Sequence, residues 1–460
     1  MMPQPRSIPA YRGRLATLHG ALLAQLLLCV APAMLAVAMR DPQTGARWLF
    51  GSLCALLVWR ILTRNPIAYL TLFTGAIPAT MMLRDYFYFN SVTVIFAAGF
   101  LLWYVVRTPE FSRIWRQRAF TGFFVIALLY WWISYLRMGT YSSNLRFLEL
   151  AFSAASIVLL GRYRSYLATA LTGIGITAVI VGAGLAPYGT RLGLADFGEA
   201  SLGNPISLGL PAALVLLLAF AHNGRWLLAE GHPLLRGALL VAVGICLLLS
   251  TSRGSWLVAV AGFLVVFAGS RRGRISILAS LIPLVVAGVL VMASGRGQFV
   301  SMYFERALDP ERTLAQRTTG RYYQWVAMPR IFAESPVWGY GPGSGLATNV
   351  RFTGSHKAWH SLYLQISVET GTIGLVLMAL LFGSLLARGM RHRNISGDAV
   401  PLMGTLCYMT IAISVSGVDA ISGVFLGLGF LAQDFTGTYV LREVYTGPAP
   451  DRYASPVAAA

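Results

Sequence analysis

Residues 15–39 read LATLHGALLAQLLLCVAPAMLAVAM and contain no Asp, Glu, Lys or Arg. About 20 apolar residues in a helix, rising about 1.5 Å each, cross the hydrocarbon core of a bilayer. Arg6, Arg12 and Arg14 precede this run. A positive flank before a long apolar run without a clean small-residue cleavage site indicates a signal anchor whose N-terminus faces the cytoplasm.

Similar runs recur along the whole chain of 460 residues, which is 56% hydrophobic and 12% charged, with a mean hydropathy of +0.65. Soluble domains carry about 25% charged residues, and ten-residue alternating segments are typical of outer-membrane barrels, so both classes are excluded. The candidate spans cover residues 15–39, 47–62, 66–83, 89–106, 119–136, 145–160, 165–186, 205–222, 233–250, 255–270, 274–293, 360–387, 399–416 and 419–440. Because two or more are short enough to be half-spans, we expect an all-α polytopic membrane protein with about 12 to 14 transmembrane helices.

Arginines between these spans indicate the orientation of the chain. Short arginine-rich loops lie at residues 107–118, 161–164, 222–236, 271–274 and 388–394. Such loops face the cytoplasm, so both termini are expected on that side. The outer face then holds residues 187–204, the turn 250–255 and one large loop, 294–359, in which we expect short helices.

Residues 1–445 are expected to form a single integral membrane domain, and the proline- and alanine-rich residues 446–460 a disordered tail.

Lys and Arg outnumber Asp and Glu by 36 to 17, and Lys357 is the only lysine. Cytoplasmic loops and a preference for arginine codons explain most of this excess, so nucleic acid is not implied. The loop 294–359, however, has eight basic and four acidic residues, which favours an anionic partner. The cysteines lie in apolar runs without paired spacing and are expected to be packing residues; they are Cys29, Cys54, Cys246 and Cys407.

Three stretches on the expected outer face are candidates for binding. Arg253 lies in the turn STSRGS (250–255), whose hydroxyls and backbone N–H groups suit phosphate oxygens, although an interfacial anchor fits as well. The stretch TTGRYYQW (318–325) predicts a helix on the membrane surface, capped by Thr319, in which Arg321 either binds a ligand or is solvated. The stretch WGYGPGSG (338–345) lacks the lysine of a P-loop and predicts a tight backbone path.

His360 stands at the start of a long apolar run. On an ideal helix, Ser367, Gly371 and Gly374 fall within about 40° of His360 and form one stripe of small residues, which admits a helix or lipid chain. A neutral imidazole is a common proton acceptor, although a histidine at a helix end is also a common capping residue. The sequence has no DxD, HExxH or CxxC motif, so we expect arginines to handle phosphate charge without a metal ion or cofactor.

His360, Ser361, Gly371 and Gly374 fit the pattern of His, then Asn, Ser or Gln, nine residues, Gly, two residues, then Gly, Thr or Tyr. This pattern resembles the signature of O-antigen ligases, membrane glycosyltransferases related to O-antigen polymerases and bacterial protein O-oligosaccharyltransferases. The stretches GNPISLG (203–209), STSRGSWL (250–257), GRYYQW (320–325) and SPVWGYGPGSG (335–345) follow the order expected for this superfamily. The resemblance spans about residues 185–376.

The resemblance implies a multi-pass protein of the bacterial inner membrane with 294–359 as a periplasmic loop. It implies transfer of O-antigen polysaccharide from undecaprenyl diphosphate to a sugar hydroxyl of the lipid A core. Our hypothesis for the mechanism is a single, metal-independent displacement that inverts the anomeric carbon, with His360 either taking the proton of the acceptor hydroxyl or orienting the acceptor. The resemblance implies His360 as the catalytic residue and Arg253 and Arg321 as diphosphate-binding residues. Arg191 is a further candidate for the diphosphate, and Asn204 for other contacts with the donor.

Three alternative functions remain open from the sequence. A polymerase and a protein O-oligosaccharyltransferase share most of the features of the ligase and differ in the acceptor. A transporter of lipid-linked glycan also uses arginines and small-residue stripes. No repeat is evident and the polar features gather on one face, which disfavours transport.

Overall fold

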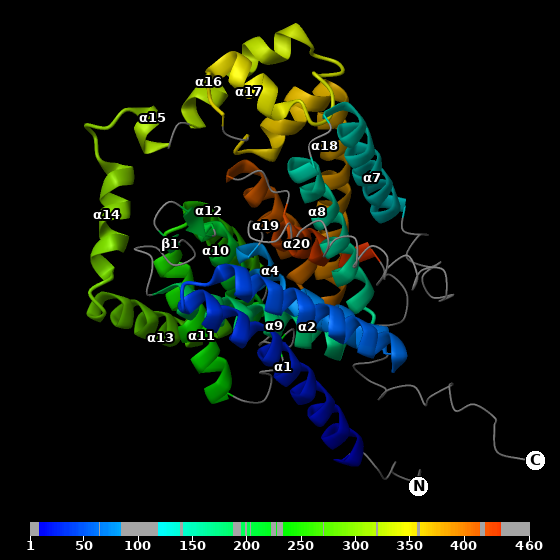
Figure 1. Cartoon of the computed structure of the whole chain (residues 1–460), viewed down its shortest axis with the longest axis vertical. Coiled ribbons are helices and arrows are strands. Elements are labelled where there is room, and N and C mark those ends of the chain that lie inside the picture. The colour runs from blue at the N-terminus through cyan, green and yellow to red at the C-terminus, as the bar shows by residue number, and fades with distance from the viewer. Residues whose placement is uncertain are drawn as a thin grey trace, which may run out of the picture.

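The computed structural model describes residues 9–63, 65–83, 118–138, 141–186, 195–197, 200–202, 204–221, 227, 233–269, 271–318, 321–356, 359–414 and 419–433. These residues are almost entirely helical, as Figure 1 shows. The exception is a small antiparallel hairpin of β1 (Ala195–Phe197) and β2 (Ala200–Leu202). The prediction of an all-α fold is confirmed. Arg191, the candidate span 89–106 and the tail 446–460 lie outside the described residues.

The described helices follow the predicted apolar runs closely. Their bounds are α1 (Pro9–Ala38), α2 (Pro42–Leu62), α3 (Pro66–Gly75), α4 (Ile77–Met82), α7 (Arg118–Met138), α8 (Tyr141–Leu160), α9 (Arg164–Leu185), α10 (Pro205–Phe220), α11 (Pro233–Ser250), α12 (Arg253–Gly269), α13 (Arg271–Ala293), α18 (Leu362–Ser396), α19 (Val400–Ser414) and α20 (Ala420–Phe430), with the short 3₁₀ helix η4 (Leu431–Gln433) after α20. One predicted span, 66–83, is divided at Ala76 into α3 and α4. Pro66 and Pro78 each stand in the first turn of their helix, where the missing N–H costs nothing.

Several described helices are suited to crossing a membrane. By length and composition four qualify, namely Leu18–Ala38, Arg118–Arg137, Arg164–Leu185 and Leu362–Ser396. The pair Ile282–Ala293 and Gly297–Tyr303, bent by 99°, makes a fifth if it counts as one span, and six shorter helices are also apolar. The chain is therefore an all-α polytopic membrane protein. The larger number of 12 to 14 crossings stays a prediction.

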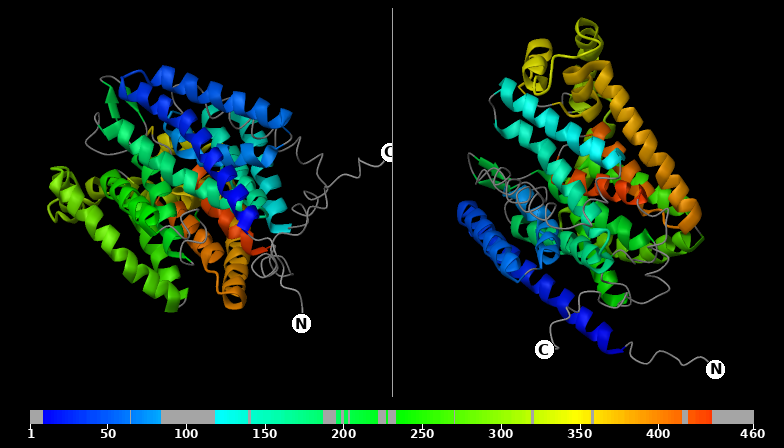
Figure 2. Two further views of the ribbon diagram at one scale, coloured as in Figure 1. Left: turned by 90° about the horizontal axis from the view of Figure 1, so that it is seen from below. Right: turned by 90° about the vertical axis from the view of Figure 1, so that its right-hand side faces the viewer.

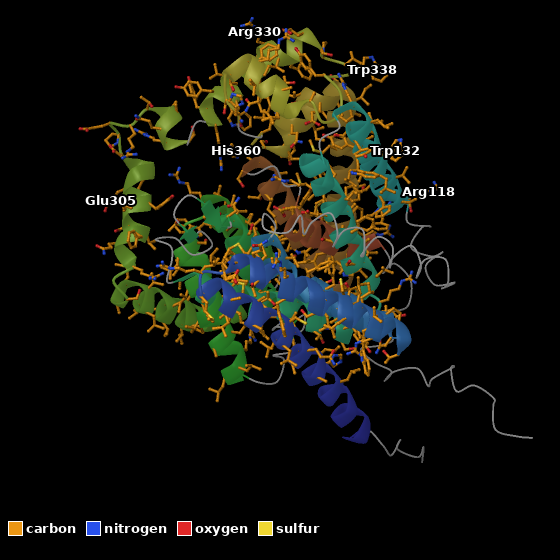
Figure 3. The ribbon with its side chains drawn as sticks, viewed as in Figure 1. Arg118, Trp132, Glu305, Arg330, Trp338 and His360 are labelled. Atoms are coloured by element: carbon orange, nitrogen blue, oxygen red, sulfur yellow. The ribbon has the colours of Figure 1, made fainter. Side chains whose placement is uncertain are left out.

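The buried core is centred on α10. Nearly every residue of α10 is buried, as expected for a helix that is apolar on all sides. Around it, helices such as α7, α12 and α13 expose large apolar side chains, including Trp132 (51%), Leu264 (65%) and Val289 (61%). Figure 3 labels Trp132 on the outer side of α7. Apolar surface of this extent is typical of side chains that face lipid.

The 294–359 segment forms a group of short helices, as predicted. These are α14 (Gly297–Leu308), α15 (Leu314–Arg317), α16 (Arg321–Glu334) and α17 (Gly345–Thr353). They rise from the end of α13 and pass over the upper ends of α12 and α19 to reach α18 (Figures 1 and 2). The helix predicted within 318–325 is confirmed from Arg321 onward, whereas its predicted cap, Thr319, lies outside the described residues. Tyr322, Tyr323 and Trp325 are exposed on α16, which fits the predicted position at a membrane surface.

Candidate functional site

The tight turn between α11 and α12 places Arg253 at the first position of α12. Thr251 adopts a positive φ of 47°, which reverses the chain within two residues. The hydroxyls of this turn are buried, contrary to expectation, and its serine hydroxyls form hydrogen bonds within the turn and with the end of α11. Ser255 Oγ donates to Ser252 Oγ (2.9 Å), and Ser252 N donates to Ser250 Oγ (3.3 Å). The hydroxyls therefore stabilise the turn. Arg253 is half-buried and is the side chain of this turn that is best placed to bind a ligand.

The stretch GNPISLG packs directly against this turn. A Cβ at Gly209 would lie 2.5 Å from Ser255 Oγ and 2.8 Å from Ser250 Oγ, so only a glycine permits the approach of α10. At the start of α10, Asn204 is exposed and its Oδ1 accepts a hydrogen bond from Ile206 N (3.0 Å). Asn204 is thus an N-cap in the structure.

Two further arginines lie beside Arg253. Its Nη1 donates to the main-chain oxygen of Arg317 (2.6 Å), at the end of α15. The Nε atoms of Arg317 and Arg321 are buried and make no hydrogen bond to the described residues. Burial, and secondly the positive charge of Arg253, lower the pKa of Arg321. Within the described part of the chain no carboxylate pairs with any of these three side chains. Among the described residues, the positive charge of this arginine cluster (Arg253, Arg317 and Arg321) is therefore not neutralised, which suits an anion.

Helix α16 connects the arginine cluster to His360. Gln324 follows Arg321 by three residues, is 3% exposed, and accepts a hydrogen bond at Oε1 from His360 N (3.2 Å). The next residue, Ser361, donates through Oγ to the main-chain oxygen of Ala412 in α19 (3.1 Å). Figure 3 shows His360 below α16, on the side that faces the membrane helices. The structure therefore brings Arg253, Arg321 and His360 together at one end of the helical core.

The predicted stripe from His360 through Gly371 is wrong, for two geometrical reasons. His360 precedes the helix, because α18 begins at Leu362 and its N-cap, Ser361, has extended dihedrals (φ −141°, ψ 131°). The helix is also broken at Gly371 (φ 61°, ψ −150°). The rotation per residue of an ideal helix therefore does not predict that His360 and Gly371 share one face.

The glycine-rich loop 335–345 fills the break in α18. Tyr340 N donates to Val368 O (2.8 Å) on one side of the break, and Thr372 N donates to Pro336 O (2.8 Å) on the other. A Cβ at Gly371 would lie 2.4 Å from Val337 O. The predicted tight backbone path is confirmed. Gly371, the first glycine of the pattern that begins at His360, is required because any larger residue would collide with this loop.

Gly371→Ala is expected to destabilise the protein strongly. Its dihedrals belong to a region that is essentially restricted to glycine, with a strain of about 1–3 kcal/mol before any clash. Gly383→Ala in the same helix is the matched control, because a Cβ there meets nothing within 4 Å; it is expected to be neutral or to stabilise by up to about 1 kcal/mol. Thermal unfolding in detergent measures both. Equal midpoints for the two variants would contradict the assigned role of Gly371.

Sequence reasoning did not single out Arg317 or Gln324 as site residues. For Gln324 the available signal was its position three residues after Arg321 on the helix predicted there, because such neighbours share a face of a helix. Arg317 ends α15, one helix earlier, so helical spacing gave no signal for it. Arg191 lies outside the described residues. Among the described residues, no group of three or more His, Cys, Asp or Glu side chains is placed to hold a metal ion.

One model of a known protein family matches part of the chain. Residues 238–379 match the family model described as O-antigen ligase. The matched region includes Arg253, Arg321, the glycine-rich loop and His360, so the resemblance inferred from the sequence is confirmed. A search of the curated proteins finds no match.

Proposed function

Because residues 238–379 carry the domain of the O-antigen ligase family, with its glycosyltransferase activity of the ligase or polymerase type, we propose that the chain is the ligase. It transfers O-antigen polysaccharide from undecaprenyl diphosphate to a sugar hydroxyl of the lipid A core, on the periplasmic face of the inner membrane, with both termini in the cytoplasm. The observation that carries the proposal is the convergence of Arg253, Arg321 and His360 through Arg317 and Gln324.

The diphosphate of the donor binds to the arginine cluster in this proposal. Arg253 and Arg321 contact its oxygens, and Arg191 is proposed as a further contact. Guanidinium groups match phosphate oxygens in two-point hydrogen bonds. Asn204 contacts the donor through its amide nitrogen, since its Oδ1 caps α10. No metal ion or nucleotide takes part.

The reaction is a single displacement at the anomeric carbon. His360 accepts the proton of the acceptor hydroxyl, whose oxygen forms a bond to the anomeric carbon. The bond from that carbon to the diphosphate oxygen breaks, and its electron pair leaves with the undecaprenyl diphosphate. The arginines stabilise the charge that develops on this leaving group. Attack opposite the leaving group inverts the anomeric configuration.

The test is a transfer reaction with purified protein in detergent, excess EDTA, undecaprenyl-diphosphate glycan and lipid A core. We expect glycosylated lipid A core with an inverted anomeric linkage. Longer lipid-linked glycan formed without lipid A core would identify a polymerase, and transfer only to a protein would identify an oligosaccharyltransferase. No product from two intact lipids, or a retained configuration, would contradict the proposal.

A further inference from the structure

A buried carboxylate lies under the glycine-rich loop. Glu369, on the last turn of α18 before the break at Gly371, is 1% exposed. Its Oε2 accepts a hydrogen bond from Gly343 N (2.9 Å), and its Oε1 accepts from Gly345 N (3.1 Å) and from Gln365 Nε2 (3.2 Å). Both oxygens are therefore occupied as acceptors by three donors of the protein itself.

Gly345 also forms a hydrogen bond with the side chain of Trp359, the residue before His360. Gly345 O accepts a hydrogen bond from Trp359 Nε1 (2.7 Å), and the indole is 2% exposed. A Cβ at Gly345 would lie 2.4 Å from Glu369 Oε1 and 3.0 Å from Trp359 Cδ1. Glu369, Gly345 and Trp359 thus form one closely packed chain of hydrogen bonds that ends next to His360.

Residues 359–361 are also held by two other hydrogen bonds, one to α16 and one to α19. The main chain of His360 is bound to Gln324 of α16, and Ser361 is bound to α19. The indole of Trp359 packs with Ile331, Leu364 and Val368 in a separate apolar cluster. The segment around His360 is therefore attached to three elements, and Glu369 is hydrogen-bonded to the one that passes through the glycine-rich loop.

We propose that Glu369 is a positioning residue for glycan transfer, which fixes His360 through Gly345 and Trp359 without touching the substrate. The inference rests on the proposed function of His360. A carboxylate is required because each oxygen accepts from a main-chain N–H. A glutamine would direct its NH₂ group at one of these N–H donors and leave that donor buried without a partner, which is costly.

The experiment compares Glu369→Gln, Trp359→Phe and the double variant in full-length protein. Phenylalanine keeps most of the ring of Trp359 and removes the N–H that bonds to Gly345. Thr372→Val is the matched control: Thr372 Oγ1 donates to Pro336 O (2.7 Å) on the other side of the break, and the main-chain bond to the same oxygen remains. The readouts are kcat and KM for the lipid-linked donor, together with hydrogen exchange of the peptide amides in residues 341–348.

Glu369→Gln is expected to lower kcat by about 10- to 100-fold with little change in the KM of the donor, since a displaced catalytic group costs rate and not binding. Trp359→Phe is expected to lower kcat by about tenfold. The kcat of the double variant is expected to be no lower than that of Glu369→Gln, because residues that act through the same series of hydrogen bonds have non-additive effects. Exchange of the loop amides is expected to be about tenfold faster in both single variants. Thr372→Val is expected to keep the kcat of the wild type.

Several outcomes would overturn the inference. A folded Glu369→Gln protein with the kcat of the wild type would do so, as would multiplied losses in the double variant or an equal loss in Thr372→Val. If Glu369→Gln does not fold, Trp359→Phe alone decides, and an unchanged kcat contradicts the proposal. A wild type without transfer activity would instead overturn the proposed function, whereas an active wild type with unaffected variants overturns the positioning role alone.

Discussion

His360→Ala will reduce the rate of glycan transfer by about 10²- to 10⁴-fold, the range that general-base catalysis supplies. The site explains why the loss should appear in kcat. The main-chain N–H of His360, not its side chain, donates to Gln324, so alanine keeps this attachment to α16. The arginine cluster, which is the proposed donor site, is therefore expected to remain in place while the proposed proton acceptor is lost. Single-turnover transfer from undecaprenyl-diphosphate glycan to lipid A core measures the effect.

His356→Ala is the matched control for this substitution. His356 lies four residues earlier in the same segment, after the end of α17, and is exposed. Its replacement is expected to leave kcat and KM unchanged. His360→Asn separates two roles, because asparagine forms hydrogen bonds but is not a base. Substantial activity in His360→Asn would mean that His360 orients the acceptor and does not take its proton.

Arg321→Ala is expected to reduce kcat/KM for the donor by about 10²- to 10³-fold, comparable with the loss of one electrostatic contact to a developing charge. The guanidinium is half-buried, lies near Arg253 and pairs with no described carboxylate. In the proposed reaction, removing it takes away positive charge that stabilises the leaving diphosphate. The loss should appear in kcat as well as in KM, because the leaving group gains charge in the transition state.

Arg330→Ala is the matched control on the same helix. Arg330 is exposed and lies over the ring of Phe352, with 5.8 Å from Cζ to the ring centroid. Figure 3 labels it on the upper side of α16, away from His360. We expect unchanged kinetics with this variant. Equal losses from Arg330→Ala and Arg321→Ala would indicate a general effect of surface charge and contradict a specific diphosphate site.

Arg321→Lys adds a pH dependence whose sign follows from the site. Burial and the charge of Arg253 lower the pKa of a cation at this position. A lysine, with a reference pKa of about 10.4, would lose its charge as pH rises toward that lowered value. Arg321→Lys is therefore expected to be partly active at neutral pH, because lysine lacks the planar fork, and to lose activity at alkaline pH before the wild type does.

The sequence by itself determined the fold class and most of the helix positions. A transmembrane helix satisfies its own backbone hydrogen bonds and must be apolar over most of its length, so composition and run length are sufficient to locate it. The run at residues 205–222 and helix α10 illustrate the agreement. The order of the motifs also indicated the resemblance to the O-antigen ligase family, because the spacing from His360 to Gly374 is local in the chain, and the family model matches residues 238–379.

Only the tertiary structure decided how the site is assembled. The break of α18 at Gly371 depends on the glycine-rich loop that lies more than 25 residues earlier in the chain. Likewise, the bonds from Arg253 to Arg317 and from Gln324 to His360 join residues 64 and 36 positions apart. Such contacts form because α14 to α17 fold back over the membrane helices, and helical periodicity carries no information about this path. The candidate groups Arg253, Arg321 and His360 were therefore readable from the sequence, whereas their connection through Arg317, Gln324 and Glu369 was not.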